Sequence, residues 1–152
     1  MNQRKRKEHY GKGYKKLLGF FAVCALCFLF SGCTSGKLAE EFSEETLENT
    51  AKEIINESLV QGAGTTIKNH MREDFLEDFP VEDMQDNLLS LQSGKGEFLY
   101  FKKISMRGEK SPRENSDEDF AIVLVTVDFE KGDILFYLTF DTDMNLVSFY
   151  VQ

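Results

Sequence analysis

The sequence has few of the residues that build catalytic and metal centres. It contains two histidines and three cysteines among 152 residues, and these side chains form no Cys/His cluster with the spacing that zinc sites use. A phosphate-binding loop is also missing, because Gly94-Lys95-Gly96 lacks the rest of such a motif. We therefore expect no metal, no cofactor and no catalytic constellation.

Negative charge dominates after the N-terminal segment. Residues 1–32 hold seven of the 18 Lys and Arg and one of the 26 Asp and Glu, so the remainder carries 11 basic and 25 acidic side chains, a net charge of −14. Such a body is repelled by the phosphates of nucleic acid and by anionic lipid. We expect no nucleic-acid partner, and the chain length allows one domain with a modest core.

The N-terminal segment has the layout of an export signal. Basic residues within positions 4–16 precede 14 uncharged residues, LLGFFAVCALCFLF, at 17–30, and Ser31 and Gly32 follow. The apolar run is shorter than the roughly 20 residues that a membrane-spanning helix needs. We therefore interpret residues 1–32 as a signal peptide, which would remove Cys24 and Cys27 from the mature chain.

The end of this segment, Phe30-Ser31-Gly32-Cys33, resembles the lipobox of bacterial lipoproteins, with Phe30 where that family usually has Leu. The resemblance implies cleavage between Gly32 and Cys33 and a covalent diacylglyceryl lipid on the Cys33 sulfur, with the new amino terminus commonly acylated. Two acyl chains anchor a protein stably. We thus expect a lipid anchor at the extracytoplasmic face of a bacterial cell membrane; an ordinary signal peptide, an uncleaved anchor and a chance cysteine are the alternatives.

The residues after the cysteine predict a tether and then a folded domain. Residues 33–43 are small, flexible and acidic, and we interpret them as a solvated tether before a domain at 44–152. Ser43 is a candidate N-cap for a helix that ends at Gly62 and Gly64. Its apolar stripe comprises Leu47, Ala51, Ile54, Ile55 and Leu59. Further helices are predicted at 65–79 and, with Pro80 in the first turn, along Val81, Met84, Leu88 and Leu91.

The second half reads as sheet. Strands are predicted at 97–107, 119–130, 133–141 and 146–151, with a polar loop at 108–118 and a hairpin at Lys131-Gly132. Helices followed by consecutive antiparallel strands predict an α+β domain, with N-terminal helices packed on a curved four-stranded antiparallel sheet.

The segment 119–130 is apolar on both faces. Phe120, Ile122 and Leu124 point one way, and the opposite face carries Ala121, Val123, Val125, Val127 and Phe129. Helices on only one side would leave the other face polar. We therefore expect a second copy of the chain, an envelope protein or bending of the sheet to cover this outer face.

The order of helices and then a meander ending VTVDFEKGDILFYLTFDTDMNLVSFYVQ resembles a bacterial family of extracytoplasmic domains, domain of unknown function 3887. That family resembles the cone-shaped nuclear transport factor 2-like (cystatin-like) fold. The resemblance covers about residues 47–151 and implies a fold, and no catalytic residue is carried over from it.

Candidate site residues are few. His70 precedes Asp74 by four positions, so one helix would pair a base with an orienting carboxylate, although a surface ion pair explains the same spacing. Tyr100, Tyr137 and Tyr150 either offer hydroxyls to a ligand in the cone or belong to an aromatic core. Asp141, Asp143 and Asn145 have the spacing that begins a calcium loop, but Leu146 stands at the glycine position, which favours a turn closed by Asx hydrogen bonds.

These features favour a membrane-anchored, non-enzymatic lipoprotein whose domain binds a protein or a small apolar ligand through its sheet. A small enzyme with a pocket in the cone, using His70 and a carboxylate, is one alternative. A structural domain that forms a homodimer within an envelope complex is another.

Overall fold

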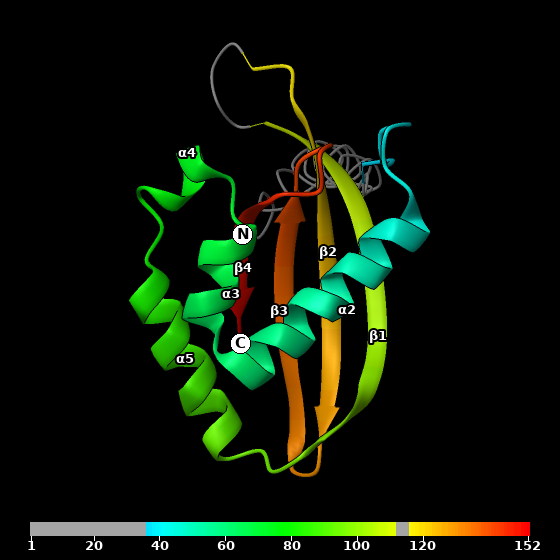
Figure 1. Ribbon diagram of the computed structural model, residues 1–152. Coiled ribbons are helices and arrows are strands. Elements are labelled where there is room, and N and C mark those ends of the chain that lie inside the picture. Colours follow the sequence, from blue (N-terminus) through cyan, green and yellow to red (C-terminus); the bar gives the residue numbers. More distant parts are fainter. Residues whose placement is uncertain (1–35, 112–115) are drawn as a thin grey trace, which may run out of the picture. The chain divides into compact units, whose positions relative to one another are not determined.

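Helices precede strands in the described part of the chain, residues 36–111 and 116–152 of the computed structural model (Figure 1). The four strands form one antiparallel sheet in the order β1-β2-β3-β4. This confirms the predicted α+β class and the antiparallel meander. The elements are α2 (Glu44–Gln61), α3 (Ala63–His70), α4 (Glu73–Leu76), α5 (Val81–Ser93), β1 (Phe98–Lys110), β2 (Asp119–Phe129), β3 (Gly132–Phe140) and β4 (Leu146–Val151).

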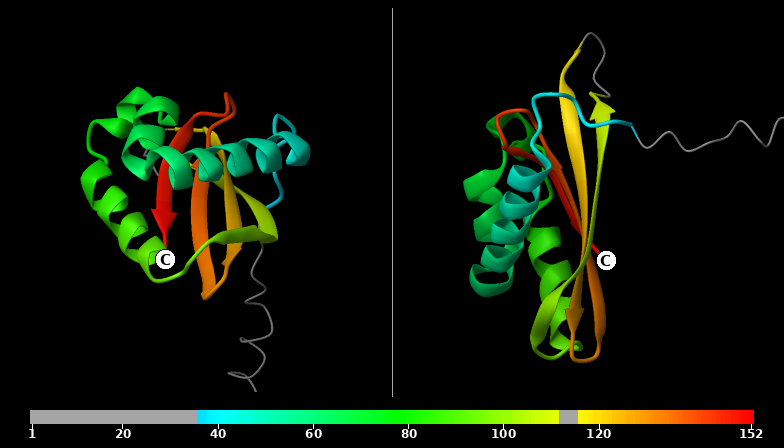
Figure 2. Two further views of the ribbon diagram at one scale, coloured as in Figure 1. Left: turned by 60° about the horizontal axis from the view of Figure 1, so that its bottom comes forward. Right: turned by 90° about the vertical axis from the view of Figure 1, so that its right-hand side faces the viewer.

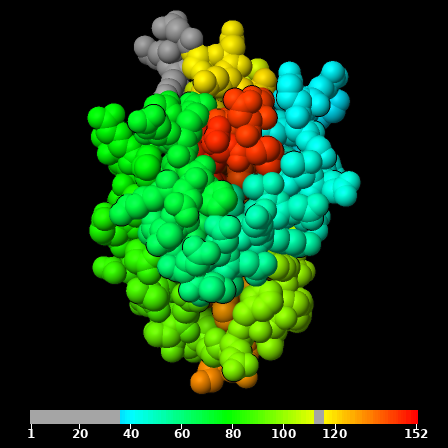
Figure 3. All heavy atoms as spheres, in the orientation of Figure 1, coloured from blue at the N-terminus to red at the C-terminus, as the bar shows by residue number. Residues whose placement is uncertain are grey.

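The described helices all lie on one side of the sheet. Figure 2 shows them packed against one face, with the other face free of helices. The space-filling view of the helical side shows α2, α3 and α5 covering most of the sheet, with the β3–β4 turn visible between them (Figure 3). We call the covered side of the sheet the inner face and the opposite side the outer face.

Helix α2 forms as predicted. The Ser43 hydroxyl accepts a hydrogen bond from the Thr46 N–H at 3.3 Å, which satisfies one of the free donors of the first turn. The stripe residues Leu47, Ala51, Ile54 and Ile55 are fully buried. Gly62 ends the helix with φ 93°, a conformation that favours glycine, whereas Gly64 lies inside α3 rather than ending α2.

The helix predicted at 65–79 is confirmed in part: it is divided into α3 and α4, because Met71 and Arg72 between them pair with the sheet. Helix α3 ends at His70, and Met71 is extended with φ −80° and ψ 136°. Met71 bridges Leu146 in parallel, and the Arg72 N–H donates to the Leu146 carbonyl at 2.8 Å. This contact satisfies part of the free edge of β4, and Asn87 covers more of it by donating from its side chain to the Val151 carbonyl at 2.9 Å.

The core lies between the helices and the inner face. Alternate residues of β2 and β3 are buried there, while Ile122, Leu124 and Thr126 between them are partly exposed. The alternation confirms that the two sides of β2 face different environments. The inner residues are Ala121, Val123, Val125, Val127 and Phe129 of β2 and Ile134, Phe136, Leu138 and Phe140 of β3.

The expected tether at 33–43 is in part a piece of the domain. Phe42 belongs to the core, and Leu38 and Ala39 pack against it. Gly36 forms an antiparallel bridge to Gly108, with the Gly108 N–H donating to the Gly36 carbonyl at 2.8 Å. On its other side, β1 runs on to Lys110, into the segment that the sequence assigned to a loop, because residues 108–110 pair with the start of β2.

The bridge between Gly36 and Gly108 requires both residues to lack side chains. A Cβ on Gly108 would stand 2.3 Å from the Lys37 carbonyl oxygen, closer than atoms approach. We expect Gly108→Ala to lower the free energy of unfolding of residues 34–152 by about 1–3 kcal/mol, because backbone must move. Urea denaturation followed by circular dichroism measures the change.

Gly94→Ala is the matched control. A Cβ at Gly94 meets no atom within 4 Å, and its φ of −100° suits any residue, so its free energy of unfolding should change by less than about 0.5 kcal/mol. Equal stability of the two variants would show that the Gly36–Gly108 approach does not hold the segment in place.

Candidate functional site

The inner face is filled by large side chains. Phe136, Phe140 and Phe149 have no exposed surface, and the rings of Phe136 and Phe149 meet edge to face with centroids 6.1 Å apart. The three candidate tyrosines are therefore not in the core. Tyr137 and Tyr150 pair with each other across β3 and β4 on the outer face, and Tyr100 pairs with Asp128 on that same face.

The outer face carries two adjacent rows of paired residues. One row runs Arg107, Ile122, Thr139 and Ser148 from β1 to β4, and the next runs Ser105, Leu124, Tyr137 and Tyr150. Side chains from both rows, together with Val151 and Gln152, line a depression of about 470 Å³. We call it the outer depression. Its volume is within the range of about 300–1,000 Å³ that small-molecule sites have.

The outer depression is apolar at its floor and polar at its rim. Ile122 and Leu124 are aliphatic, and Arg107 is the one cation among the lining residues. The Arg107 guanidinium stands 3.7 Å from the Glu109 carboxylate, a contact that leaves most of its five N–H donors to solvent. At the other end the Gln152 amide donates to the Tyr137 hydroxyl at 2.5 Å, and the Phe79 ring lies 6.0 Å from the Tyr150 ring.

Tyr100 belongs to a separate polar cluster near the β2–β3 hairpin. Its hydroxyl hydrogen-bonds the Asp128 carboxylate, which raises the pKa of Tyr100 above its ordinary value. The Lys102 ammonium contacts Asp133 at 2.9 Å and Asp128 at 3.8 Å. The hydrogen bond from Lys102, followed by one involving Asp128, lowers the pKa of Asp133. These groups form hydrogen bonds and ion pairs with one another, and they do not line the outer depression.

His70 pairs with a different carboxylate from the one expected. Its Nε2 lies 2.7 Å from the Glu57 carboxylate of α2, and the expected spacing to Asp74 along one helix is not formed because α3 ends at His70. His70 lines neither the outer depression nor a second depression of about 450 Å³ between α3 and α5. The helical pair proposed from the sequence is therefore wrong.

The segment with calcium-loop spacing is a turn. The buried Asp141 carboxylate accepts from the Asp143 and Asn145 N–H groups at 3.1 and 2.8 Å. Asp141 also accepts from Arg72 at 3.2 Å. The Asx-closed turn is confirmed, and no cluster of three or more acidic, His or Cys side chains suited to a metal occurs among residues 36–111 and 116–152.

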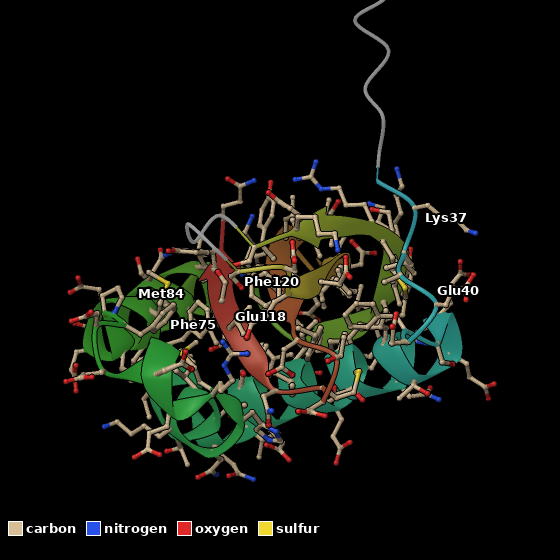
Figure 4. The ribbon with its side chains drawn as sticks, turned by 90° about the horizontal axis from the view of Figure 1, so that it is seen from above. Lys37, Glu40, Phe75, Met84, Glu118 and Phe120 are labelled. Carbon is tan, nitrogen blue, oxygen red and sulfur yellow. The ribbon has the colours of Figure 1, made fainter. Side chains whose placement is uncertain are left out.

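Arg72 joins this turn to neighbouring segments, a feature that the sequence did not indicate. It contacts the Asp74 carboxylate at 2.7 Å and the Glu118 carboxylate at 3.3 Å, and these acids raise the pKa of Arg72, with the hydrogen bond that Arg72 donates to Asp74 as the largest cause. Phe75 and Phe120 meet nearby at 6.1 Å, and Figure 4 shows both close to Glu118. The cluster ties α4 to the start of β2.

The remaining site residues of the sequence, Gly32 and Cys33, lie outside the described residues. Of the described helices, none is both long and apolar enough to cross a bilayer. The point where the described chain begins is Gly36, three positions after Cys33, and it bridges Gly108, the neighbour of Arg107.

The structure is thus an α+β domain with helices on one face of its sheet and the outer depression on the other face. The chain belongs to a family of proteins of unknown function, DUF3887, which matches residues 51–149. A protein from Ruminococcus gnavus solved by NMR is similar, with 29% sequence identity and a TM-score of 0.63, covering 74% of this chain and 94% of that one. No curated protein matches the chain.

The hydrogen bond between Tyr100 and Asp128 makes a testable electrostatic prediction. We expect Tyr100 to ionise at higher pH than an ordinary tyrosine and Asp128→Asn to bring its pKa back toward 10.0. Because the folded pKa is raised, the contribution of this bond to stability is present below the ordinary pKa and is lost as the pH rises through the folded pKa. NMR of ¹³Cζ-labelled tyrosine over residues 34–152 resolves the individual titrations.

Asp119→Asn is the control for that titration. Asp119 pairs with Lys110 at 2.8 Å, at the opposite end of the strand pair, so its loss should leave the titration of Tyr100 unchanged. An unshifted Tyr100 in the Asp128→Asn variant would show that the bond to Asp128 is not the cause.

Proposed function

We propose that this protein is a lipid-anchored lipoprotein of the bacterial cell envelope, and that its domain is a non-enzymatic binding module at the extracytoplasmic face. The anchor is inferred from the signal-like layout of residues 1–32 and from Cys33 after Ser31 and Gly32. We further infer that helices on one face of the sheet make this a cone of the nuclear transport factor 2-like type.

The observation that carries the binding role is the contrast between the two faces. The inner face is closed by a core whose residues have little or no exposed surface, whereas the outer face presents a half-exposed apolar strip within a depression. Apolar surface left on the side without helices is typical of a site that contacts another molecule. The enzyme alternative placed His70 and a carboxylate in a pocket; His70 does contact the Glu57 carboxylate, but it lines neither of the two depressions described above.

Substitution of the anchoring cysteine tests the location. In a bacterial host, we expect the full chain to be recovered in the membrane fraction and to incorporate labelled fatty acid, and Cys33→Ser to lose the label, because only the Cys33 sulfur accepts the lipid. Fractionation followed by immunoblotting and fluorography measures both.

The two other cysteines provide matched controls. Cys24→Ser and Cys27→Ser should keep both the label and the membrane fraction, since these residues leave with the signal peptide. Label retained by the Cys33→Ser variant would contradict the proposed anchor. Membrane retention without label in that variant would instead indicate an uncleaved signal segment.

The oligomeric state tests whether the outer face is free for a ligand. We expect residues 34–152 to have the mass of one chain in light scattering across concentration, because the net charge of −14 after residue 32 repels a second copy. The measurement is repeated in 0.5 M salt, where the Debye length falls to about 4 Å and this repulsion is screened.

A dimer at both salt concentrations would contradict the binding role and assign the outer face to self-association. Leu124→Lys would then separate the chains if the interface is the outer depression, since Leu124 lines it.

A further inference from the structure

We propose that the outer depression binds a single-chain anionic amphiphile, a fatty acyl chain that ends in a carboxylate, with Arg107 holding the carboxylate. This inference rests on the proposed binding role of the outer face and names the ligand class for it. Three features of the depression support it: its floor, its charge and its width.

The floor suits an acyl chain better than a peptide. The strands that form it have their backbone groups paired within the sheet, so an occupant meets side chains only. Ile122 and Leu124 lie beside Tyr137 and Tyr150, and a hydrocarbon chain there brings no backbone donor or acceptor that must be paired. A peptide backbone laid on the same floor would lose the water bound to its N–H and C=O groups, which is costly.

The charge of the depression is opposite to that of the domain around it. No acidic residue lines it, and Arg107 does. A protein with a net charge of −14 beyond residue 32 attracts cations in general, so selective binding of an anion requires a local positive group. The 3.7 Å contact between Arg107 and Glu109 is long and half-exposed, so it competes weakly with a ligand carboxylate for the guanidinium fork.

The width of the sheet sets the direction and length of the chain. Arg107 is on β1, and the row that it begins crosses Ile122 and Thr139 to reach Ser148 on β4. Three inter-strand spacings of about 4.8 Å place the two ends of the row about 14 Å apart, the reach of an extended chain of about a dozen carbons. The carboxylate then lies at β1, and the methyl end lies at β4, beside Ser148 and Tyr150.

Titration with dodecanoate below its micelle concentration tests the proposal. The probe is added at pH 7.5 to isotopically labelled residues 34–152, and amide and methyl NMR shifts are followed. We expect saturable shifts at Ile122, Leu124 and Tyr150, and binding of octanoate about tenfold weaker, because four partly buried methylenes are lost. Dodecyltrimethylammonium, with the same chain and the opposite charge, should bind more weakly at these residues.

Two variants on β1 distinguish a specific contact with Arg107 from a general effect of net charge. Arg107→Gln should weaken dodecanoate about three- to fivefold, the size of an exposed ion pair, and should leave dodecyltrimethylammonium binding no weaker. Lys103→Gln removes an equal charge from an exposed residue of the same strand outside the depression, and should leave the dodecanoate affinity unchanged.

The results that would contradict the acyl-chain ligand differ from those that would contradict the proposed binding role. Two results would contradict an anionic ligand and would still agree with a binding role for the outer face. These are equal binding of both amphiphiles at the outer depression, and equal affinity of Arg107→Gln and the unchanged chain for dodecanoate. Dodecanoate shifts confined to core residues, or no shifts at all, overturn the ligand class and its site. A chain that is dimeric as well as unresponsive removes both this inference and the proposed function.

Discussion

One-sided burial of the sheet is the constraint on which the rest of the structure depends. Inner residues of β2 and β3, such as Val125 and Phe136, are removed from water by helices that contribute Ile54, Ile67 and Leu88. Burial of large apolar side chains is the main favourable term in folding. With a single helical layer in the described domain, the inner face receives nearly all of that burial, and the outer face is left with partly exposed side chains.

The same constraint determines how the two edges of the sheet are treated. At the β4 edge, the Arg72 N–H and the Asn87 side chain donate to the carbonyls of Leu146 and Val151. Among the described residues, the β1 edge is bridged by Gly36 at one end. Register shifts between Phe98 and Tyr100 and between Phe101 and Lys103 make the rest of that edge irregular, which discourages pairing with another chain. Addition of a further strand at this edge is therefore disfavoured.

Local periodicity in the sequence predicted the elements whose burial repeats along one segment. The stripe from Leu47 to Ile55 and the alternation within β2 were both confirmed. The features that were not predicted depend on contacts between residues far apart in the sequence. The helix break at Met71 depends on Leu146, and the attachment of the segment that begins at Gly36 depends on Gly108. Neither partner is close in sequence, so neither feature has a local signal.

The position of the candidate site was missed for a different reason. The tyrosines were expected either in a pocket of the cone or in an aromatic core, although alternation with the buried Phe136 and Leu138 puts Tyr137 on the outer face. In β4 a register shift after Thr139 lets Leu146 and Phe149 both face inward although three positions separate them. A strict period of two, applied from one end of β4 alone, therefore misassigns part of the strand. Strand parity had to be combined with the pairing register to locate the depression.

The short link between Cys33 and the domain lowers the affinity that the outer depression needs in order to bind its proposed ligand. Three residues span at most about 10 Å when fully extended, and Gly36 is bridged to the residue beside Arg107. A lipid on Cys33 would therefore keep the outer depression close to the bilayer surface, where fatty acyl chains are concentrated. A high local concentration raises occupancy without any additional contact. If Cys33 carries the proposed lipid, the outer depression therefore needs a lower affinity for the proposed ligand than a site on a protein free in solution needs.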